Sequence, residues 1–567
     1  MPAYRLHVGF ALKSDTILET APPTTQSSAA SFEIAGQFVD LFHNRVYPAS
    51  VRVENGQIAG IQPVADAPSV FIMPGFVDAH VHIESSMLTP AQFARLAVAH
   101  GTVATVSDPH EIGNVLGVAG VRYMVENGAK VPFRFCFGAP SCVPATDFET
   151  AGAVITVADV ENLLQMDGIG YLAEVMNYPG VLNRDPELMA KIAAAQRRGK
   201  PVDGHAPGLR GAQALRYAQA GISTDHECFT AGEALDKLAA GMKILIREGS
   251  AAKNFEALIS LLPDYPNQIM FCSDDKHPDS LALGHINLLV RRAVAKGYGV
   301  FDALRAACVN PVEHYRLEVG LLRVGDAADF IMVDNLLDFK VLQTYIGGQL
   351  VARNGKSLIA PVESETVNRF SASLKSPEQF AVKDDGKDLQ VIEAIDGQLI
   401  TSKIVCAPKV KTGFVVADTD RDLLKITVVN RYADAPPAVA FIKNFGFRHG
   451  AIASSVAHDS HNIIAVGTDD ESICRAINLI ISVKGGLSAV AENEEMLLPL
   501  PIAGLMTDAD GYEVAAQYTQ LDKMAKRMGS RLQSPFMTLS FMALLVIPSL
   551  KLSDKGLFDG DAFQLAG

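Results

Sequence analysis

The strongest constraint on the fold is a pattern repeated between residues 71 and 319. Short apolar runs that end in polar residues alternate there with Ala- and Leu-rich stretches, which is typical of β–α units. Candidate strands fall at residues 75–82, 103–110, 133–144, 170–177, 201–207, 222–227, 242–250 and 269–275. Eight units in about 250 residues predict a (β/α)8 TIM barrel. A doubly wound sheet is the alternative, but only a barrel brings all the polar strand ends to one face.

The segments that flank this region have a different texture. Residues 32–70 and 320–365 both contain short β-prone runs separated by turns, so we expect them to build one small β-sandwich-like domain together. The Asn-Gly pair within Glu54–Gln57 predicts a hairpin turn.

The remaining segments predict a lead-in, a linker and a third domain. Residues 1–31 are rich in small and polar residues, and residues 366–387 include a charged run typical of a linker. Residues 388–567 contain several strand-like runs and predict a separate α/β or α+β domain. The uncharged stretch Leu532–Leu550 contains prolines and hydroxyl side chains, which favour a buried strand–turn segment over a membrane span.

Charge and cysteine content exclude several classes of protein. The formal net charge is −14 over 567 residues, which argues against a nucleic-acid binder with a basic face. Seven cysteines without a CxxC pair, and no recognisable secretory signal, indicate a cytoplasmic protein with no membrane partner. A homo-oligomer is the expected state of such a chain.

Six ligand-type side chains fall at the ends of five candidate strands. They are His80, His82, Glu174, His205, His226 and Asp274. The first two histidines are two positions apart on a strand, so their side chains point the same way. Each residue alone could be a hydrogen-bonded core residue, but carboxylates gathered at one barrel mouth are costly unless cations offset their charge. Imidazole and carboxylate donors suit Zn, Mn or Fe rather than Ca, and this many ligands fit two divalent metal ions better than one.

The same stretches resemble the adenine deaminase family of the amidohydrolase superfamily. The resemblance covers about residue 35 to the C-terminus and rests on DAHVHIESSML, SDPHEIGNV, APSCVPAT, LAEVMN, DGHAPGL, TDHE, CSDDKHPD and SSVAHDSHNII. Many amidohydrolases carry a bridging lysine on the fourth strand, where this chain has Glu174. That difference argues against hydantoinase and dihydroorotase types and agrees with adenine deaminases.

The resemblance also implies how the metal ions are held. His80, His82, Glu174 and Asp274 would hold one ion, whereas Glu174, His205 and His226 would hold the other. Which carboxylate bridges them stays open. Asp275 competes with Asp274 for its role, but its side chain points to the other side of a strand.

The implied activity is the hydrolysis of adenine to hypoxanthine and ammonia in purine salvage. Hydroxide formed on the metal ions would attack C6 of the base. Asp274 would take its proton and return one to the departing ammonia, with Glu174 in the catalytic centre as a metal ligand and Glu227 as a second proton carrier. The alternatives are another amidohydrolase with the same centre, such as a related deaminase or a deacetylase, or a non-catalytic metal-binding homologue.

The candidate contacts for the base follow the strand ends or lie in the last domain. A planar, uncharged base calls for acids, amides or backbone groups and an apolar wall. The candidates are Ser86, Asp108, His110, Glu111, His458 and His461. Turn and loop capping is the alternative role for most of them, and an extra metal ion for His110. We expect the loop Arg448–Gly467 to cap the barrel mouth.

Overall fold

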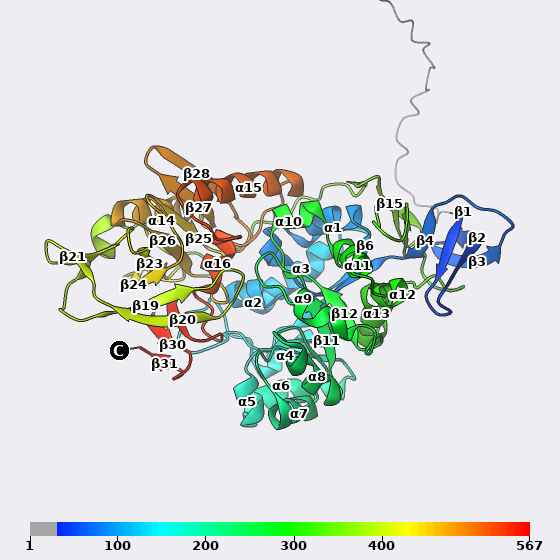
Figure 1. Cartoon of the computed structure of the whole chain (residues 1–567), viewed down its shortest axis with the longest axis horizontal. Coiled ribbons are helices and arrows are strands. Elements are labelled where there is room, and N and C mark those ends of the chain that lie inside the picture. The colour runs from blue at the N-terminus through cyan, green and yellow to red at the C-terminus, as the bar shows by residue number, and fades with distance from the viewer. Residues whose placement is uncertain (1–30, 567) are drawn as a thin grey trace, which may run out of the picture.

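The structure is a computed structural model, and it describes residues 31–566. The predicted lead-in at residues 1–31 therefore lies almost entirely outside the described residues. The described chain forms a central barrel, a small β-domain at one end and a C-terminal domain at the other (Figure 1).

The barrel consists of short parallel strands that return to their starting point. They are β5 (Phe76–His82), β6 (Thr102–Ser107), β7 (Arg134–Ala139), β8 (Ile169–Val175), β9 (Val202–Gly204), β10 (Thr224–Asp225), β11 (Lys243–Arg247), β12 (Ile269–Cys272) and β13 (Asp274–Asp275). Strand β13 continues β12 and pairs with β5, with Asp274 opposite Val81. Between β9 and β10, Ser223 N donates to Val202 O at 2.9 Å. The predicted barrel fold is confirmed.

Helices cover the outside of this barrel. They are α1 (Pro90–Ala99), α2 (His110–Leu116), α3 (Val118–Gly128), α4 (Val157–Leu163), α5 (Tyr178–Leu182), α6 (Pro186–Arg197), α7 (Gly211–Gln219), α8 (Ala231–Ala239), α9 (Phe255–Leu258), α10 (Pro278–Leu283), α11 (Ile286–Ala295), α12 (Val300–Leu304) and α13 (Asn310–Tyr315). Because helices cover one side and packed side chains fill the other, every residue of β5 and β6 is buried. This burial explains why the strands read as continuous apolar runs with polar ends.

The two flanks of the barrel share one sheet. Its strands are β1 (Phe32–Asp40), β2 (Arg45–Glu54), β3 (Gln57–Pro63), β4 (Phe71–Pro74), β14 (Phe330–Val333), β15 (Val341–Ile346), β16 (Gln349–Arg353) and β17 (Lys356–Ser357). The halves join where β4 pairs with β14, with Phe71 opposite Val333. Strands β2 and β3 form the predicted hairpin, and its turn needs the positive φ of Asn55 (51°) and Gly56 (77°).

The C-terminal domain is built on a second large sheet. Its strands, in spatial order, are β20 (Thr401–Cys406), β19 (Leu389–Ala394), β24 (Ala438–Lys443), β23 (Leu423–Val429), β26 (Ile463–Gly467), β25 (Ala451–Ser454), β27 (Gly486–Ala491) and β28 (Glu494–Pro499). Helix α14 (Asp470–Val483) buries Ile473, Ile477 and Ile480 against this sheet. Two small sheets complete the domain, β18 (Val382–Lys383) with β21 (Lys409–Lys411) and β22 (Phe414–Val416), and β29 (Leu550–Ser553) with β30 (Gly556–Asp559) and β31 (Gln564–Leu565).

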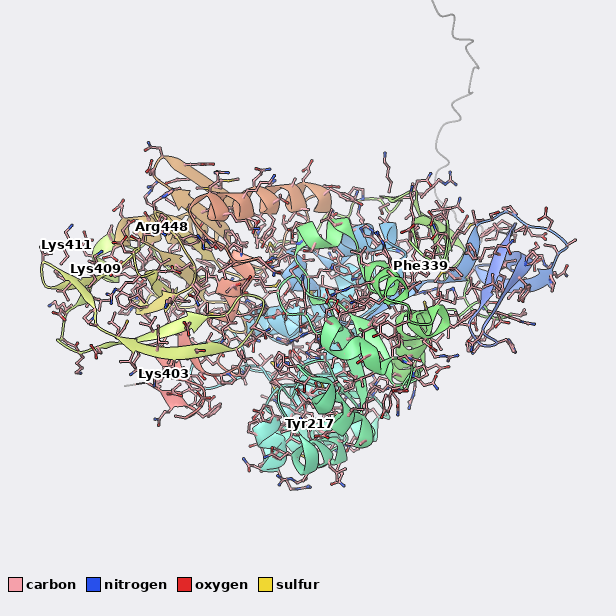
Figure 2. All side chains as sticks on the ribbon, in the orientation of Figure 1. Tyr217, Phe339, Lys403, Lys409, Lys411 and Arg448 are labelled. Carbon is pink, nitrogen blue, oxygen red and sulfur yellow. The ribbon has the colours of Figure 1, made fainter. Side chains whose placement is uncertain are left out.

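The C-terminal domain contacts the barrel beside the end of β13. Tyr518 of α15 (Gly511–Arg527) forms a hydrogen bond with His277, and Arg95 of α1 donates to Asp510 at 3.0 Å. Lys403, Lys409 and Lys411 lie on the part of the domain that faces away from the barrel (Figure 2).

The uncharged stretch Leu532–Leu550 is mostly buried and contains turns, as predicted, but its main regular element is a helix and not the predicted strand. The helix is α16 (Pro535–Phe541), and Pro535 occupies its first turn, where a missing N–H is tolerated. An apolar run of this length without a clear period does not distinguish a buried helix from a strand. None of the helices in residues 31–566 is both long and apolar enough to span a bilayer.

Candidate metal centre

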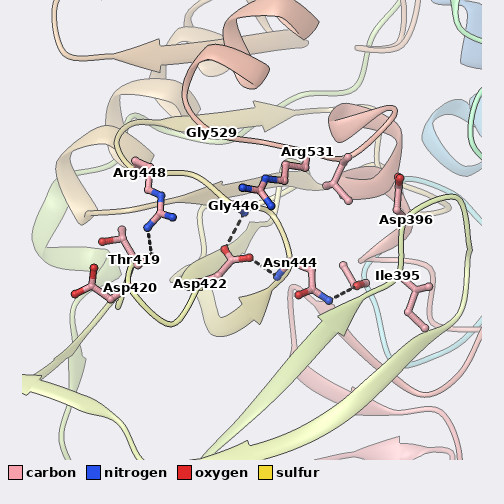
Figure 3. A pocket seen from close by; sticks show the side chains of 12 residues that line it. Ile395, Asp396, Thr419, Asp420, Asp422, Asn444, Gly446, Arg448, Gly529 and Arg531 are labelled. Atoms are coloured by element: carbon pink, nitrogen blue, oxygen red, sulfur yellow. Dashed lines mark hydrogen bonds between the residues drawn. The ribbon is translucent and has the colours of Figure 1, made fainter.

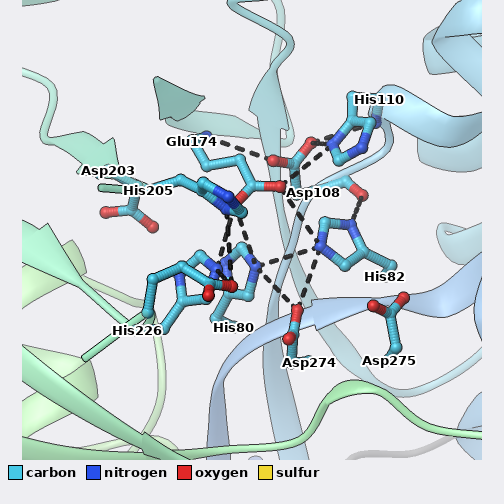
Figure 4. Close-up of polar contacts among 12 residues, drawn as sticks. His80, His82, Asp108, His110, Glu174, Asp203, His205, His226, Asp274 and Asp275 are labelled. Carbon is cyan, nitrogen blue, oxygen red and sulfur yellow. Dashed lines mark hydrogen bonds and ion pairs between the residues drawn. The ribbon is translucent and has the colours of Figure 1, made fainter. Parts of the chain in front are cut away.

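Two histidines from β5 face one carboxylate at the barrel mouth (Figure 4). His80 Nε2 and His82 Nε2 lie 3.2 Å apart. They lie 3.5 Å and 3.3 Å, respectively, from Oδ1 of Asp274, on the neighbouring strand β13. Two ring nitrogens that face each other and share one carboxylate oxygen are placed as ligands of a common cation.

Glu174, at the end of β8, lies between two sets of imidazoles. Its Oε2 is 2.9 Å from His205 Nδ1 and 3.1 Å from His226 Nε2. Its Oε1 is 3.5 Å from His82 Nε2. The carboxylate therefore presents one oxygen to each set, which is the geometry a bridging ligand needs.

Surrounding hydrogen bonds hold these ligands in place. The hydroxyl of Tyr217, on α7 (Figure 2), accepts from His205 N at 3.1 Å and donates to Val175 O at 2.7 Å. Asp108 Oδ2 accepts from Glu174 N at 3.2 Å. Such supporting contacts fix the direction in which a ligand side chain points.

Arg247, at the end of β11, is a member of the site that the sequence reasoning missed. Its buried guanidinium donates to Asp274 Oδ2 at 2.8 Å and to Glu227 Oε2 at 3.0 Å, with a further contact to Glu227 Oε1. It therefore binds the oxygen of Asp274 that points away from the histidines. The available signal was a charged residue at a strand end, the same signal that revealed the ligands.

The electrostatics of the cluster favour ionised carboxylates. Burial alone raises the pKa of Glu174, but His205 and His226 outweigh it and hold the pKa well below its usual value. Burial also raises the pKa of Asp274, and Arg247 with His80 more than offsets it, so this pKa is also well below its usual value. Two ionised acids buried among imidazoles are an environment that divalent cations stabilise.

The residues present fit a divalent metal ion on the chemistry of their donors. The cluster offers four imidazoles and two carboxylates, all buried, and several subsets have donor atoms within 4.8 Å of one another. His205 Nε2 is buried without a hydrogen-bond partner among the described residues. Buried polar atoms without partners are costly, and a bound cation would remove that cost.

The structure brings Asp108 and His110, two predicted contacts of the base, into the metal cluster itself. His110 Nδ1 lies 3.2 Å from Asp108 Oδ1 and 3.5 Å from Glu174 Oε1. With His82 and Glu174, these two residues form a group of four potential ligands. The sequence placed them correctly at the end of the second strand, but it did not show how close the β6 and β8 ends lie.

Glu111 connects the barrel to the C-terminal domain. Its two oxygens contact His458 Nδ1 and His461 Nε2, which belong to the loop predicted to cap the mouth. Burial raises the pKa of Glu111, but His458 and His110 outweigh it and hold this pKa well below its usual value. His458 Nε2 lies 3.8 Å from Asp275 Oδ1, which also accepts from Ser85 Oγ, so Asp275 contacts both this loop and the turn after β5.

Ser86, another predicted contact of the base, is not among the residues that line the cavity at the barrel mouth. Its hydroxyl donates to Ile83 O at 2.6 Å, which closes a short 3-10 turn (Ile83–Ser86) after β5. Serine commonly serves a turn in this way, so the residue acts in local structure.

The cavity over the metal cluster is small, about 20 Å³. Its apolar lining consists of Met176 of the barrel and of Leu399, Phe541 and Leu544 of the C-terminal domain. That volume holds about one water molecule.

A wider cavity of about 750 Å³ lies within the C-terminal domain (Figure 3). It is lined by Arg448, Arg531 and three aspartates but by no histidine. Asp422, one of these aspartates, accepts from Asn444 N at 3.0 Å and Gly446 N at 2.8 Å. This aspartate therefore serves the local backbone, and the cavity does not share the chemistry of the metal cluster.

A parallel-stranded barrel with imidazole and carboxylate donors at its mouth defines the class, a metal-dependent amidohydrolase. Residues 71–351 match the Amidohydrolase family, and residues 398–564 match the Adenine deaminase C-terminal domain. The chain belongs to the adenine deaminase family, as the resemblance predicted. It is 59% identical to the adenine deaminase of Sulfurovum sp. (strain NBC37-1), over 94% of this chain and 98% of the relative. It is 57% identical to that of Salinibacter ruber, with the same coverage.

The solved structures that align with this chain have much lower sequence identity to it. A β-aspartyl dipeptidase from Fervidobacterium islandicum AW-1 aligns with a TM-score of 0.44 and 14% identity, over 57% of this chain and 98% of that chain.

Proposed function

We propose that the chain hydrolyses adenine to hypoxanthine and ammonia at a centre of two divalent metal ions, and that it acts in purine salvage. The proposal is supported by relatives named adenine deaminase that match almost the whole chain. The structural observation that carries it is the position of Glu174, whose two oxygens face separate imidazoles.

His80, His82, Asp274 and Glu174 would hold one ion, and Glu174, His205 and His226 would hold the other. Divalent ions in such a site supply Lewis acidity, which lowers the pKa of water from about 16 to about 7 and provides a nucleophile at neutral pH. Mn, Fe and Zn all suit this donor set.

Asp274 moves the proton in this proposal. Its Oδ1 faces the histidines, and its Oδ2 is held by Arg247. The carboxylate takes a proton from the attacking water and later gives one to the departing ammonia, which requires an acid of fixed orientation. Glu227 binds Arg247 through both of its oxygens and therefore orients the arginine, although it also lies 3.5 Å from His226 Nε2.

The edge of the base would be recognised by the acids and histidines at the contact between the domains. Glu111, His458, Asp275 and Asp459 line the cavity on that side. Carboxylates accept hydrogen bonds from the N–H groups of the base, and imidazole can donate to its ring nitrogens. No basic clamp for a phosphate lines the cavity in the described residues, which favours the free base over a nucleotide.

We further infer a cytoplasmic homo-oligomer that acts on a small molecule and binds neither nucleic acid nor membrane. The net charge of −14 supports the absence of a nucleic-acid partner, and seven cysteines without a CxxC pair support the cytoplasmic setting.

The test is metal analysis of the purified chain paired with ammonia release from adenine, adenosine and cytosine. We expect about two ions per chain and turnover of adenine alone. Turnover of an amide or another amine instead of adenine would favour a different amidohydrolase, such as a related deaminase or a deacetylase. Absence of turnover in metal-replete protein would favour a non-catalytic metal-binding homologue.

A further inference from the structure

The small cavity over the metal cluster is roofed by three apolar side chains of the C-terminal domain. Leu399 lies between β19 and β20, Phe541 ends α16, and Leu544 follows it. All three line the cavity and are at least 95% buried. We call Leu399, Phe541 and Leu544 the roof. They face the cluster from residues far away in the sequence, on a different domain.

Phe541, the aromatic residue of the roof, packs against His458 of the site. Phe541 stacks on His458, with ring centroids 5.2 Å apart and ring planes 29° apart. His458 is in turn fixed by Glu111 of the barrel. Stacked aromatic rings of this kind attract one another, and Phe541 also lines the cavity.

A buried lysine joins the two segments of the roof. Lys551 of β29 is fully buried and donates to Leu399 O and, at 2.9 Å, to Phe541 O. The two segments are joined again where Thr401 N donates to Pro548 O at 3.1 Å. These polar groups therefore bond within the C-terminal domain, which makes the roof one unit carried by that domain.

A purine ring system is many times larger than a water molecule, so it does not fit a cavity of about 20 Å³. The barrel side of the cavity is built from strand ends that are fixed by the parallel ladder and by Arg247. The roof side is a loop, the end of a short helix and a turn, and elements of this kind supply the moving parts of enzyme lids.

We propose that Leu399, Phe541 and Leu544 form the apolar wall against which one face of the purine lies, and that this roof, joined by Lys551, moves away from the metal cluster as a unit to admit the base. This inference rests on the proposed function, because it takes adenine as the occupant. In this proposal the C-terminal domain selects a flat, unsubstituted ring as substrate, and the barrel carries out the hydrolysis.

The first test compares two phenylalanines of the same helix. Phe541→Leu removes the aromatic ring beside the cavity, whereas Phe536→Leu removes a ring that is equally buried but packs near Tyr518, with centroids 6.1 Å apart. We expect Phe541→Leu to raise KM for adenine about tenfold while kcat and metal content stay within about twofold. Phe536→Leu should leave KM within about twofold of the wild-type value. An unchanged KM in Phe541→Leu, or an equal rise of KM in both variants, would contradict the proposal that Phe541 forms a wall of the adenine site.

The second test measures motion. Amide hydrogen exchange of the metal-replete chain is compared with and without saturating hypoxanthine, the expected product. We expect exchange to slow in residues 397–401 and 541–548 and to stay constant in α14, on the sheet of the same domain. Protection confined to the barrel, with no change in the roof segments, overturns the moving roof. Loss of the proposed function itself would be recognised separately, because wild-type protein would then release no ammonia from adenine.

Discussion

The substitution Arg247→Met tests whether one buried cation organises the acids of the site. Arg247 is 1% exposed and bonds two carboxylates that are 3% and 1% exposed, Asp274 and Glu227. With metal bound, Asp274 keeps a cation as a partner, but Glu227 is left charged and buried without one. Removing one member of a buried pair costs about 3–5 kcal/mol.

We therefore expect urea unfolding of metal-replete Arg247→Met to show a loss of about 3–5 kcal/mol. Its kcat should fall by about 10²-fold, since Asp274 keeps its charge but loses its orientation. KM should change little, because Arg247 does not line the cavity. Arg527→Met is the matched control: Arg527 donates to both oxygens of Glu494 and both side chains are exposed, so its loss should cost less than about 1 kcal/mol.

A double variant makes the reasoning decisive. If the cost of Arg247→Met comes from a stranded charge on Glu227, then adding Glu227→Gln removes that charge and recovers part of the lost stability. Stability unchanged from the wild type in Arg247→Met, or a double variant that is less stable than the single one, would refute the assignment.

Three further outcomes are expected. Asp274→Asn should lower kcat by several orders of magnitude while metal stays partly bound, and near wild-type activity would remove Asp274 from the proton step. Glu174→Ala should lower metal content from about two ions to one or none by elemental analysis, and an unchanged content would contradict bridging. Burial lowers the pKa of Lys551 to about 7, so between pH 7 and 9 the unfolded chain holds a proton that the folded chain releases. The unfolding free energy of the wild type relative to Lys551→Met should therefore rise by roughly 1 kcal/mol per pH unit over that range, and a flat or falling difference would show that Lys551 stays charged when folded.

Much of the fold and of the metal centre could be predicted from the sequence because the signals were local. A parallel strand buried on both sides reads as an apolar run, and its end is marked by a polar residue. His80 and His82 show their shared direction by their spacing alone, and the other ligands occupy the same place on later strands. The barrel then gathers these ends at one mouth, so the pattern carried spatial information.

The missing parts depended on contacts between segments that the sequence does not connect. From the sequence, Arg247 could be a long side chain at the end of a strand whose charged group extends into solvent. Only the structure shows that its guanidinium is bound by Glu227. Phe541 and Leu544 belong to an apolar stretch whose neighbours are set by domain packing, so nothing local linked them to His458. A serine at position 86 is equally compatible with a role in a turn and with a contact to the base. In the structure its hydroxyl forms a hydrogen bond within the turn.

The pairing of β4 with β14 has a consequence for how the barrel can be exchanged or truncated. The chain passes into the barrel region after Phe71–Pro74 and leaves it before Phe330–Val333, and these two strands are hydrogen-bonded neighbours about 5 Å apart. The barrel is thus an insertion between β4 and β14, and the pairing of these two strands in the small β-domain holds the two ends of the barrel segment together. A truncation on either side of the barrel would leave β4 or β14 without its partner strand. The barrel can therefore be moved to another protein only together with both flanking parts of this sheet.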